Sequence, residues 1–557
     1  MRYLSLVNIY QQLEKTAKRL EKTAIIAQFL APVPAEELSS LIMLLQGRVF
    51  SQWDSRDIGF SARLMIKALE KATGSSAKNI ETLWTKTGDL GKVAADLVKK
   101  KTQATLTTEE LSVKKVITNL QKLETVEGIG AVERKISLVA ELITSATPEE
   151  ARFIVRTVLG ELRVGIATGI VRDAISQAFY QNNAAVENAF DLIGDYGEAA
   201  VHAKNGTLGS VSLKPGRPVN AMLSILVQNV GEALEALGKP AQFEPKLDGF
   251  RLQIHKHHEK ILLFTRRLEN VTKQFPDIAA NILSHVQGDD FILDAEAVGF
   301  DPKTGKHLPF QHISQRIKRK YDIAMMAQKL PVEINVFDVL YYNHTNMMDK
   351  PLQERRALLE TIVTNEPRKV RVTEALITAD EQHAEQFFKT CLQAGNEGVM
   401  IKNRTMRYRP GRYVDGWCKL KQTLEPLDLV IVAATWGEGK RAKWLSSFTV
   451  ACRSHGQFLE VGRVSTGLKE KEEEGVTFQK LTKLLKPSIL DHKGREVTVK
   501  PQIVVEVAYE EIQKSPTYSS GYAMRFPRIL RLRIDEKTTE DINTLADIER
   551  IAAAQRK

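Results

Sequence analysis

One short segment, Phe243-Glu244-Pro245-Lys246-Leu247-Asp248-Gly249-Phe250-Arg251, sets Lys246 in a K-x-D-G pattern. A lysine amine becomes a nucleophile once it has lost its proton. By itself a four-residue match of this kind is more typical of a surface turn, because short motifs occur often by chance. The meaning of Lys246 therefore depends on the polar clusters that follow it along the chain.

Five further polar clusters follow Lys246, and each supplies one part of a nucleotidyl-transfer site. They occupy residues 265–270, 294–297, 336–339, 397–402 and 417–421. In this order the clusters resemble the motif series of the covalent nucleotidyltransferases, which are the polynucleotide ligases and the mRNA capping enzymes. The ligase branch is the better match.

Bulk composition is that of a folded protein with several domains. A length of 557 residues predicts three or four domains at about 150 residues each. A hydrophobic fraction of 43% and a charged fraction of 26% are typical of globular proteins. The formal charge of +11 favours a polyanionic partner. Cys391, Cys418 and Cys452 are too few and too widely spaced for a disulfide framework or a four-cysteine zinc site, which indicates a reducing compartment.

The N-terminus lacks the apolar core and cleavage site of a signal peptide, and the sequence contains no stretch of about 18 uncharged apolar residues. We therefore expect a cytoplasmic, nucleoid-associated protein with no membrane role.

The pattern of apolar residues changes twice along the chain, which predicts a multidomain α+β protein. Up to about residue 205 the apolar spacing is helical, whereas strand-like runs begin at Phe243. A second change after Lys421 opens a segment of short strands typical of a small β-barrel. Prolines mark the joints. We predict an all-α domain at 1–217, an α+β domain at 218–422 and a β-barrel domain at 423–557. The resemblance to the ligases implies that these are a DNA-binding domain, a nucleotidyltransferase (adenylation) domain and an OB-fold domain.

A nucleophilic lysine must lose its proton although its ordinary pKa is about 10.4, so it needs nearby cations or desolvation. Arg251, Arg266, Lys419 and Lys421 would bring positive charge to Lys246, and a magnesium-bound triphosphate would balance it. We expect attack of Lys246 on the α-phosphorus of ATP, which gives a lysyl-AMP phosphoramidate and releases pyrophosphate.

The resemblance also implies roles for other residues around the nucleotide. Isolated glutamates are usually surface groups and an aromatic in an apolar strand usually belongs to the core. In the family, however, the residue matching Glu296 contacts the ribose or the metal, and the one matching Glu397 assists metal binding. The expected ion is Mg²⁺, with Mn²⁺ as a substitute. The residue matching Phe337 stacks on adenine, and Glu244 helps to recognise the base.

Two stretches depart from the family pattern. Tyr413 holds the usual arginine position, so Arg412 is kept as the candidate nucleotide contact although an offset of one residue on a strand reverses the side-chain direction. Near the C-terminus an arginine-rich segment is similar to the last motif of DNA ligases, in which arginines orient the pyrophosphate; Asp535-Glu536-Lys537 replaces the usual Asp-Lys. The candidate contacts there are Arg525, Arg528, Arg531 and Arg533.

The N-terminal region contains a glycine turn that enters a basic helix start, a geometry that offers backbone N–H groups to phosphate. Its candidate DNA contacts are Gly128, Gly130, Arg134 and Lys135. With residues 46–50 and 159–165, this turn resembles the DNA-binding domain of archaeal and eukaryotic replicative ligases. In some relatives a glutamine followed by aromatics docks a sliding clamp, whereas the loop at Gln103 lacks the aromatics.

The resemblance implies an ATP-dependent DNA ligase that seals nicks in duplex DNA during replication, repair and recombination, acting as a monomer. An RNA ligase or a capping-type enzyme would share the Lys246 chemistry, and a non-catalytic DNA-binding scaffold would share the fold. An NAD-dependent ligase is disfavoured because the expected cysteine-rich zinc module is absent. Use of ADP or GTP, the metal preferred in the cell and the open or closed arrangement of the domains stay open.

Overall fold

The structure is a computed structural model that describes residues 1–54, 56–100, 110–317, 319, 321–411, 413–422, 424–437, 441, 443–470, 476–534 and 536–554. The candidate nucleotide contact Arg412, the loop at Gln103 that lacks the clamp-docking aromatics, and the altered motif residue Asp535 lie outside the described residues.

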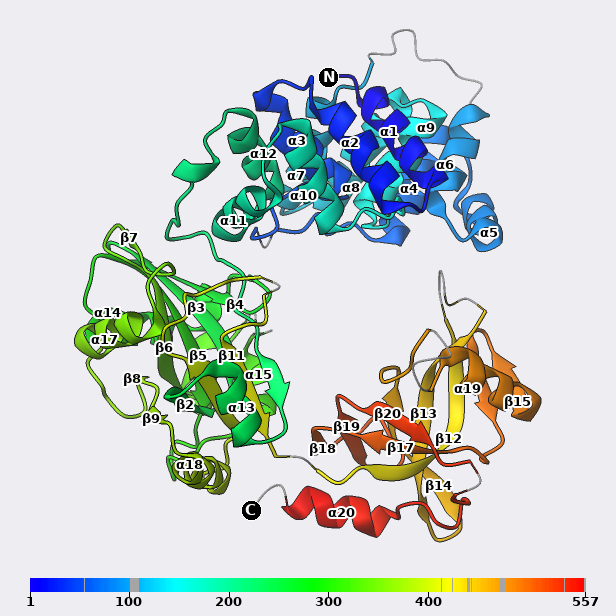
Figure 1. Ribbon diagram of the computed structural model, residues 1–557. Helices are drawn as coiled ribbons and strands as arrows, with labels where there is room; N and C mark the ends of the chain where they lie inside the picture. Colours follow the sequence, from blue (N-terminus) through cyan, green and yellow to red (C-terminus); the bar gives the residue numbers. More distant parts are fainter. Residues whose placement is uncertain are drawn as a thin grey trace. The chain divides into compact units, whose positions relative to one another are not determined.

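The N-terminal region is helical, as the apolar spacing predicts (Figure 1). On α3, for example, Leu38, Leu41, Ile42 and Leu45 are buried on one face and pack into a core shared by the other helices. The helices are α1 (Tyr3–Lys15), α2 (Arg19–Leu30), α3 (Ala35–Leu45), α4 (Ala62–Thr73), α5 (Ala77–Thr87), α6 (Leu90–Lys99), α7 (Val113–Thr125), α8 (Ala131–Ser145), α9 (Pro148–Val158), α10 (Thr168–Ala178), α11 (Asn183–Ile193), α12 (Tyr196–Lys204) and the 3-10 turn η1 (Leu208–Ser210).

The central region combines strands with covering helices. A six-stranded sheet has the order β4-β3-β5-β6-β7, with β8 parallel to β6, and a five-stranded sheet has the order β1-β11-β10-β2-β9. The strands are β1 (Ile225–Val227), β2 (Ala241–Lys246), β3 (Phe250–His257), β4 (Lys260–Thr265), β5 (Asp290–Gly299), β6 (Val332–Tyr342), β7 (Thr345–Asn346), β8 (Val370–Val372), β9 (Leu376–Thr378), β10 (Gly398–Asn403) and β11 (Trp417–Lys421). The helices are α13 (Val230–Leu237), η2 (Thr272–Gln274), α14 (Pro276–His285), α15 (Phe310–Ile317), α16 (Ile323–Lys329), α17 (Leu352–Ile362) and α18 (Glu381–Gln393).

The two faces of the six-stranded sheet differ in chemistry because side chains alternate along a strand. On β3, Leu252 and Ile254 point into an apolar core that includes Ile278 of α14 and Leu359 of α17. Figure 1 shows these two helices along one side of the sheet. The alternate residues of β3, β5 and β6 form the opposite, polar face, and this face carries the candidate site.

The C-terminal region is β-rich, as predicted. Its largest sheet has the order β14-β13-β12-β16-β15, and β17 joins β12 to β20, while β18 pairs with β19. The strands are β12 (Leu427–Trp436), β13 (Leu445–Ser454), β14 (Gln457–Val464), β15 (Ile489–Lys493), β16 (Glu496–Val499), β17 (Val504–Ala508), β18 (Glu511–Lys514), β19 (Tyr522–Arg525) and β20 (Arg528–Leu532). The helices are α19 (Phe478–Leu485), η5 (Lys486–Ser488) and α20 (Leu545–Ala554).

Contacts divide the chain into two compact units. The first unit comprises Met1–Ile225, Leu237–Ala379 and Ile401–Cys418, and the second comprises Leu226–Ala236, Asp380–Met400 and Lys419–Lys557. The domain boundaries at 217/218 and 422/423 stay predictions.

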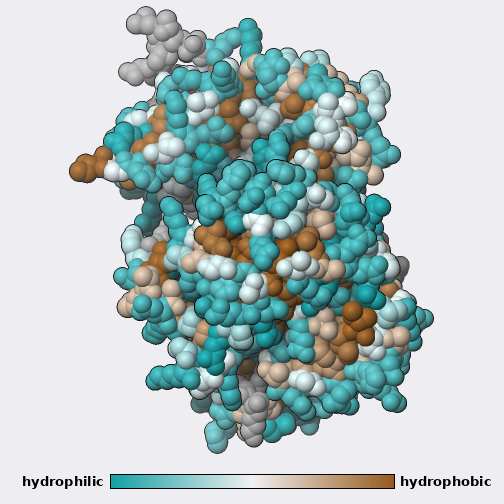
Figure 2. Space-filling view, turned by 90° about the vertical axis from the view of Figure 1, so that its left-hand side faces the viewer, coloured by the Kyte–Doolittle hydropathy of each residue, from teal (hydrophilic) through white to brown (hydrophobic). Residues whose placement is uncertain are grey.

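The surface is mainly hydrophilic on the face shown in Figure 2, with hydrophobic residues gathered in patches. Over the described residues, none of the helices is both long and apolar enough to span a membrane.

Candidate active site

Lys246 lies at the end of β2, where a fully buried strand reaches partial exposure. The turn that follows is shaped by Gly249, since a Cβ there would lie 2.4 Å from the carbonyl oxygen of Ala297 and 3.0 Å from Cγ of Glu296. Only glycine permits so close an approach of the turn to β5. Asp248 accepts a hydrogen bond of 3.3 Å from the N–H of Phe310 at the start of α15. The K-x-D-G pattern thus fixes the turn after Lys246 against two neighbouring elements.

The polar face of the six-stranded sheet brings two of the candidate residues together. Arg251 on β3 stands directly opposite Glu296 on β5 in the antiparallel register. Glu296 is half-buried and in turn stands opposite Asn335 of β6. Residues facing one another across such a pair have side chains on the same side of the sheet. Arg251 and Glu296 therefore share one face, as a common site requires.

Arg251 is held by a buried network. Its Nη2 donates to Asp294 Oδ1 at 2.5 Å, and the Tyr408 hydroxyl donates to Asp294 Oδ2 at 2.7 Å. The backbone N–H of Met222 donates to the Tyr408 oxygen at 3.0 Å. Burial alone lowers the pKa of Arg251, but Asp294 and Tyr408 outweigh it and the net shift is upward. Arg251 therefore stays charged, with its guanidinium fixed in direction.

A second buried pair lies two residues before Lys246. Lys402 Nζ on β10 lies 2.6 Å from Glu244 Oε2, and Gln242 Nε2 donates to Glu244 Oε1 at 2.7 Å. Lys402 Nζ also lies 4.7 Å from the ring centroid of Phe337 and 4.6 Å from that of Trp417. These distances are suitable for cation–π attraction. One buried ammonium group thus joins Glu244 to Phe337, the two residues expected at the base.

Phe337 is positioned by its neighbour in β6. Asp338 is fully buried and accepts two hydrogen bonds from Arg355 of α17, at 2.6 Å from Nε and 2.9 Å from Nη2. Arg355 Nη1 further donates to the carbonyl oxygens of Lys350 and Met406. The Phe337 ring itself is half-buried and meets Trp417 edge-on, with 6.1 Å between centroids. This anchoring fixes an aromatic face beside the Lys402 ammonium.

Glu397, Lys419 and Lys421 lie in the second unit. There Lys421 Nζ is 3.0 Å from Glu397 Oε2 and 2.7 Å from Glu510 Oε2. Burial lowers the pKa of Lys421, but the two carboxylates raise it and the net shift is upward. Arg525 Nη1 is 3.3 Å from Glu511 and 3.8 Å from Glu397. The carboxylate expected to assist a metal is thus flanked by cations.

The other C-terminal arginines differ in their surroundings. Arg528 is exposed, whereas Arg531 pairs with Glu506. Arg533 Nε donates to Asp428 Oδ1 at 3.0 Å, and Lys537 Nζ lies 2.6 Å from the other oxygen of that carboxylate. Arg533 and Lys537 therefore converge on Asp428 within the C-terminal region.

The N-terminal glycine turn has the left-handed geometry that glycine favours. Gly128 has a φ of 84°, and Gly130, which precedes α8, has a φ of 75°. Arg134 is exposed and its guanidinium donates to the carbonyl oxygens of Ile129 at 2.9 Å and Glu127 at 2.7 Å. Arg134, in the first helical turn of α8, thus stabilises the preceding glycine turn. Ile129 lies in that glycine turn and is fully exposed.

Comparison with known proteins assigns all three regions to one family. Three family models match the chain: "DNA ligase N terminus" at residues 2–176, "ATP dependent DNA ligase domain" at 221–421 and "ATP dependent DNA ligase C terminal region" at 441–536. The chain is 46% identical over its whole length to the DNA ligase of Nanoarchaeum equitans, covering 99% of that protein. The chain belongs to the family of ATP-dependent DNA ligases. The DNA ligase of Thermococcus onnurineus is 41% identical over 99% of this chain and 97% of its own.

A solved structure titled "Pmar-Lig_Pre." aligns with 95% of this ligase chain and 99% of its own, with a TM-score of 0.58 and 16% sequence identity. At that identity the likeness concerns the fold alone. It covers the helical, the central and the β-rich regions together.

Several residues of the candidate site were not predicted from the sequence. Lys402 belongs to the 397–402 cluster and Trp417 to the 417–421 cluster, but neither was given a role. The sequence signal for Lys402 was its place inside an otherwise apolar strand, because a lysine buried there requires a charged or polar partner. Asp294 and Tyr408 gave no comparable signal, since their contact joins residues 114 positions apart.

Proposed function

We propose that this chain seals nicks in duplex DNA with ATP, through an AMP group carried on Lys246. The observation that carries the proposal is the position of Lys246, at the end of β2 and two residues beyond the buried Glu244–Lys402 pair. Membership of the ATP-dependent DNA ligase family supports the nucleotide and the nucleic acid.

In the first step Lys246 Nζ attacks the α-phosphorus of ATP. A nitrogen–phosphorus bond forms, the bond to the pyrophosphate oxygen breaks, and the attacking nitrogen releases a proton to solvent, which gives a phosphoramidate with an uncharged nitrogen and one negative charge on its phosphoryl oxygens. In the second step the AMP passes to the 5′-phosphate at the nick and Lys246 is regenerated. In the third, the adjacent 3′-hydroxyl attacks that 5′-phosphate, forms the phosphodiester bond and displaces AMP.

The base would lie against Phe337, whose ring is held half-buried beside Lys402. A purine has a flat π-face that suits such a surface. Glu244 would read the base edge, as its family position implies. Arg251 Nη1 is buried without a hydrogen-bond partner among the described residues, so one guanidinium donor remains for the nucleotide. Arg266, Lys419 and Lys421 would add positive charge around the phosphates.

The carboxylates of Glu296 and Glu397 are suitable ligands for a divalent metal, and we propose that they bind Mg²⁺. Glu296 is half-buried on the polar sheet face, and carboxylate oxygens are the donors that Mg²⁺ prefers. When bound, the ion neutralises charge on the phosphates. Within the protein, the cationic side chains of Lys421 and Arg525 lie 3.0 Å and 3.8 Å from the Glu397 carboxylate.

DNA contacts are proposed for the glycine turn, through the backbone at Gly128 and Gly130 and the side chains of Arg134 and Lys135. Contacts of this kind read the phosphate backbone, so binding is expected to be independent of sequence and to weaken steeply with salt. Arg525, Arg528, Arg531 and Arg533 are proposed to orient pyrophosphate or to contact DNA. The three-domain division, a monomeric state and a location at the nucleoid in the cytoplasm stay predictions.

The test is sealing of a labelled nicked duplex with ATP and Mg²⁺, with ADP, GTP and NAD in parallel and Mn²⁺ in place of Mg²⁺. We expect joined product with ATP, and none from the Lys246→Ala variant. Matched nicked RNA tests the RNA ligase alternative. Tight DNA binding without joining or adenylation by the wild type would favour the non-catalytic scaffold instead.

A further inference from the structure

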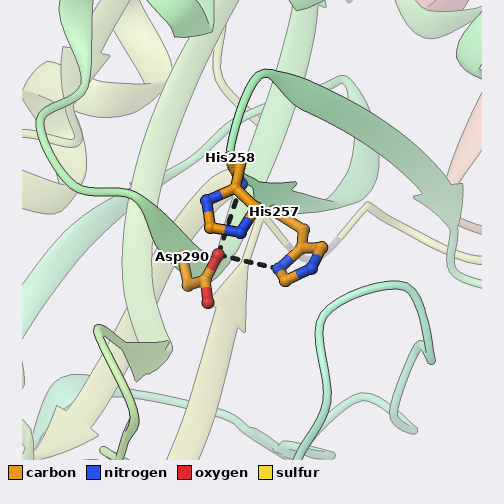
Figure 3. A group of neighbouring side chains, drawn as sticks. All are labelled: His257, His258 and Asp290. Carbon is orange, nitrogen blue, oxygen red and sulfur yellow. Dashed lines mark hydrogen bonds and ion pairs between the residues drawn. The ribbon is translucent and has the colours of Figure 1, made fainter.

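Two histidines and one aspartate meet at the end of β3 that is remote from Lys246 (Figure 3). His257 is the last residue of β3, and His258 begins the turn to β4 with a φ of 50°. Asp290 is the first residue of β5 and stands opposite His257 in the register. One ligand atom from each side chain can be chosen so that all three lie within 4.8 Å of one another. The strand register and the turn therefore gather three metal-binding groups.

The carboxylate of this cluster is fixed in place. Asp290 is 5% exposed, and its Oδ1 accepts hydrogen bonds from His257 Nδ1 at 2.8 Å and from the backbone N–H of His258 at 3.3 Å. The backbone N–H of Asp290 donates to the side chain of Asn343 at 3.2 Å, and the N–H of Asn343 donates to the Asp290 carbonyl at 2.8 Å. Two hydrogen bonds therefore hold the carboxylate and two more hold the backbone of Asp290, which makes this side chain a preorganised ligand.

Both imidazoles are exposed, so they can rotate toward a common centre. The His257 side chain is 61% exposed, and the two rings lie 4.5 Å apart between centroids. Ligand atoms bound to one tetrahedral ion at about 2 Å are separated by about 3.3 Å. Small rotations of the exposed rings about the fixed Asp290 would reach that spacing, whereas the backbone stays in place.

We propose that His257, His258 and Asp290 bind a divalent transition-metal ion of the zinc type. Two imidazole nitrogens and one carboxylate oxygen suit Zn²⁺ and its neighbours in the first transition row, whereas Mg²⁺ prefers oxygen ligands alone. Three protein ligands leave a coordination position for water. The ion would replace the direct bond between His257 and Asp290 and link the β3–β4 turn to the start of β5.

This metal site is separate from the nucleotide site. β3 spans the eight residues Phe250–His257, with Arg251 of the candidate active site near one end and His257 at the other. At about 3.3 Å per residue, the strand separates its ends by roughly 23 Å. The ion would therefore act on the stability of the central sheet, because a ligand that binds only the folded state stabilises it.

The test uses the full-length protein, freed of metal with a chelator and then titrated with Zn²⁺ by calorimetry. Co²⁺ absorption reports imidazole coordination independently, and the melting temperature reports stabilisation. We expect one Zn²⁺ per chain, with binding weakened by about tenfold or more in each of the variants His257→Asn and His258→Asn. The matched control is His383→Asn, which alters an exposed histidine of α18 and should bind Zn²⁺ like the wild type.

Folding of the variants is checked by circular dichroism and by adenylation with ATP and Mg²⁺, which a remote site should leave unchanged. The proposal is overturned if Zn²⁺ binds His257→Asn and His258→Asn as tightly as the wild type. It is equally overturned if the wild type binds no Zn²⁺ at micromolar concentration, or if Mg²⁺ competes with Zn²⁺ on equal terms.

Discussion

Lys402 Nζ lies 2.6 Å from Glu244 Oε2, with 2% and 3% of the two side chains exposed. The pair joins β10 to β2, and its Lys402 ammonium lies over the rings of Phe337 and Trp417. Each of these buried charges is stabilised by the other, because removing one partner would leave an uncompensated charge out of contact with water. Glu244 is thereby held as a fixed acceptor close to the nucleophile.

The Lys402→Met variant should strongly destabilise the central domain. It leaves Glu244 buried without its cation, a change that typically costs about 3–5 kcal/mol. Urea unfolding measures this loss. The double variant Glu244→Gln/Lys402→Met removes both charges and should recover much of the stability while adenylation stays low. Equal instability of the single and the double variant would contradict the charge-pair account.

Replacing Gly249 by alanine should displace the turn after Lys246. The added Cβ would lie 2.4 Å from the Ala297 carbonyl oxygen, a backbone atom that cannot move aside. We expect adenylation to fall by at least about tenfold, because a displacement near 1 Å at a reacting group can reduce rates by about a hundredfold. Gly209→Ala is the matched control, since no atom lies within 4 Å of its Cβ position. Comparable loss in both variants would count against a specific role for this close approach.

Removing the Tyr408 hydroxyl should loosen Arg251. In Tyr408→Phe, Asp294 loses a donor at 2.7 Å and the Met222 N–H loses its acceptor. Leaving such buried groups without partners costs about 1–3 kcal/mol. Thermal and urea unfolding test the loss, with Tyr180→Phe as the control because Tyr180 is almost fully exposed. An unchanged stability in Tyr408→Phe would show that the network does not hold Arg251.

The buried imidazole of His255 predicts a pH dependence of stability. Burial, and then the charge of Arg251, lower its pKa from 6.5 to about 3. The neutral ring accepts from the Gly216 N–H at 2.9 Å and lies 3.0 Å from Gln253 Oε1. Below pH 6.5 the unfolded chain binds a proton that the folded chain does not. The stability that the neutral His255 ring contributes to the folded state is therefore fully present above pH 6.5 and is lost as the pH falls toward 3.

Urea unfolding at intervals between pH 7 and pH 5 measures this effect. His255→Gln should reduce the slope of unfolding free energy against pH by up to about 1.4 kcal/mol per unit. His383→Gln, at an exposed position, serves as the control. Identical slopes in the wild type and His255→Gln would refute the assignment of this pH dependence to His255.

Much of the fold could be predicted from local sequence patterns. The strand-like runs at 252–255, 261–264 and 334–337 lie within β3, β4 and β6, and the helical spacing at 38–45 lies within α3. Period-2 and period-3.6 patterns report which face of an element is buried, so local sequence suffices for them. The run at 503–507 is offset by one residue from β17.

Side-chain partnerships within the site could not be predicted in the same way. Glu244 and Lys402 are 158 positions apart, and Arg251 meets Asp294 and Tyr408 through strand pairing and a distant loop. Register and packing set these contacts, and no local pattern encodes them. Lys246 was found because its motif is contiguous, whereas Lys402 needed the fold to reveal its partners.

Adenylation of Lys246 is tested most directly by the intact mass of the protein, stripped of prebound AMP and then incubated with ATP and Mg²⁺. Peptide mapping then locates any modified residue. We expect one AMP per chain, attached to Lys246 and absent from the Lys246→Ala variant. An AMP adduct on another residue, or an unchanged adduct in Lys246→Ala, would contradict this expectation.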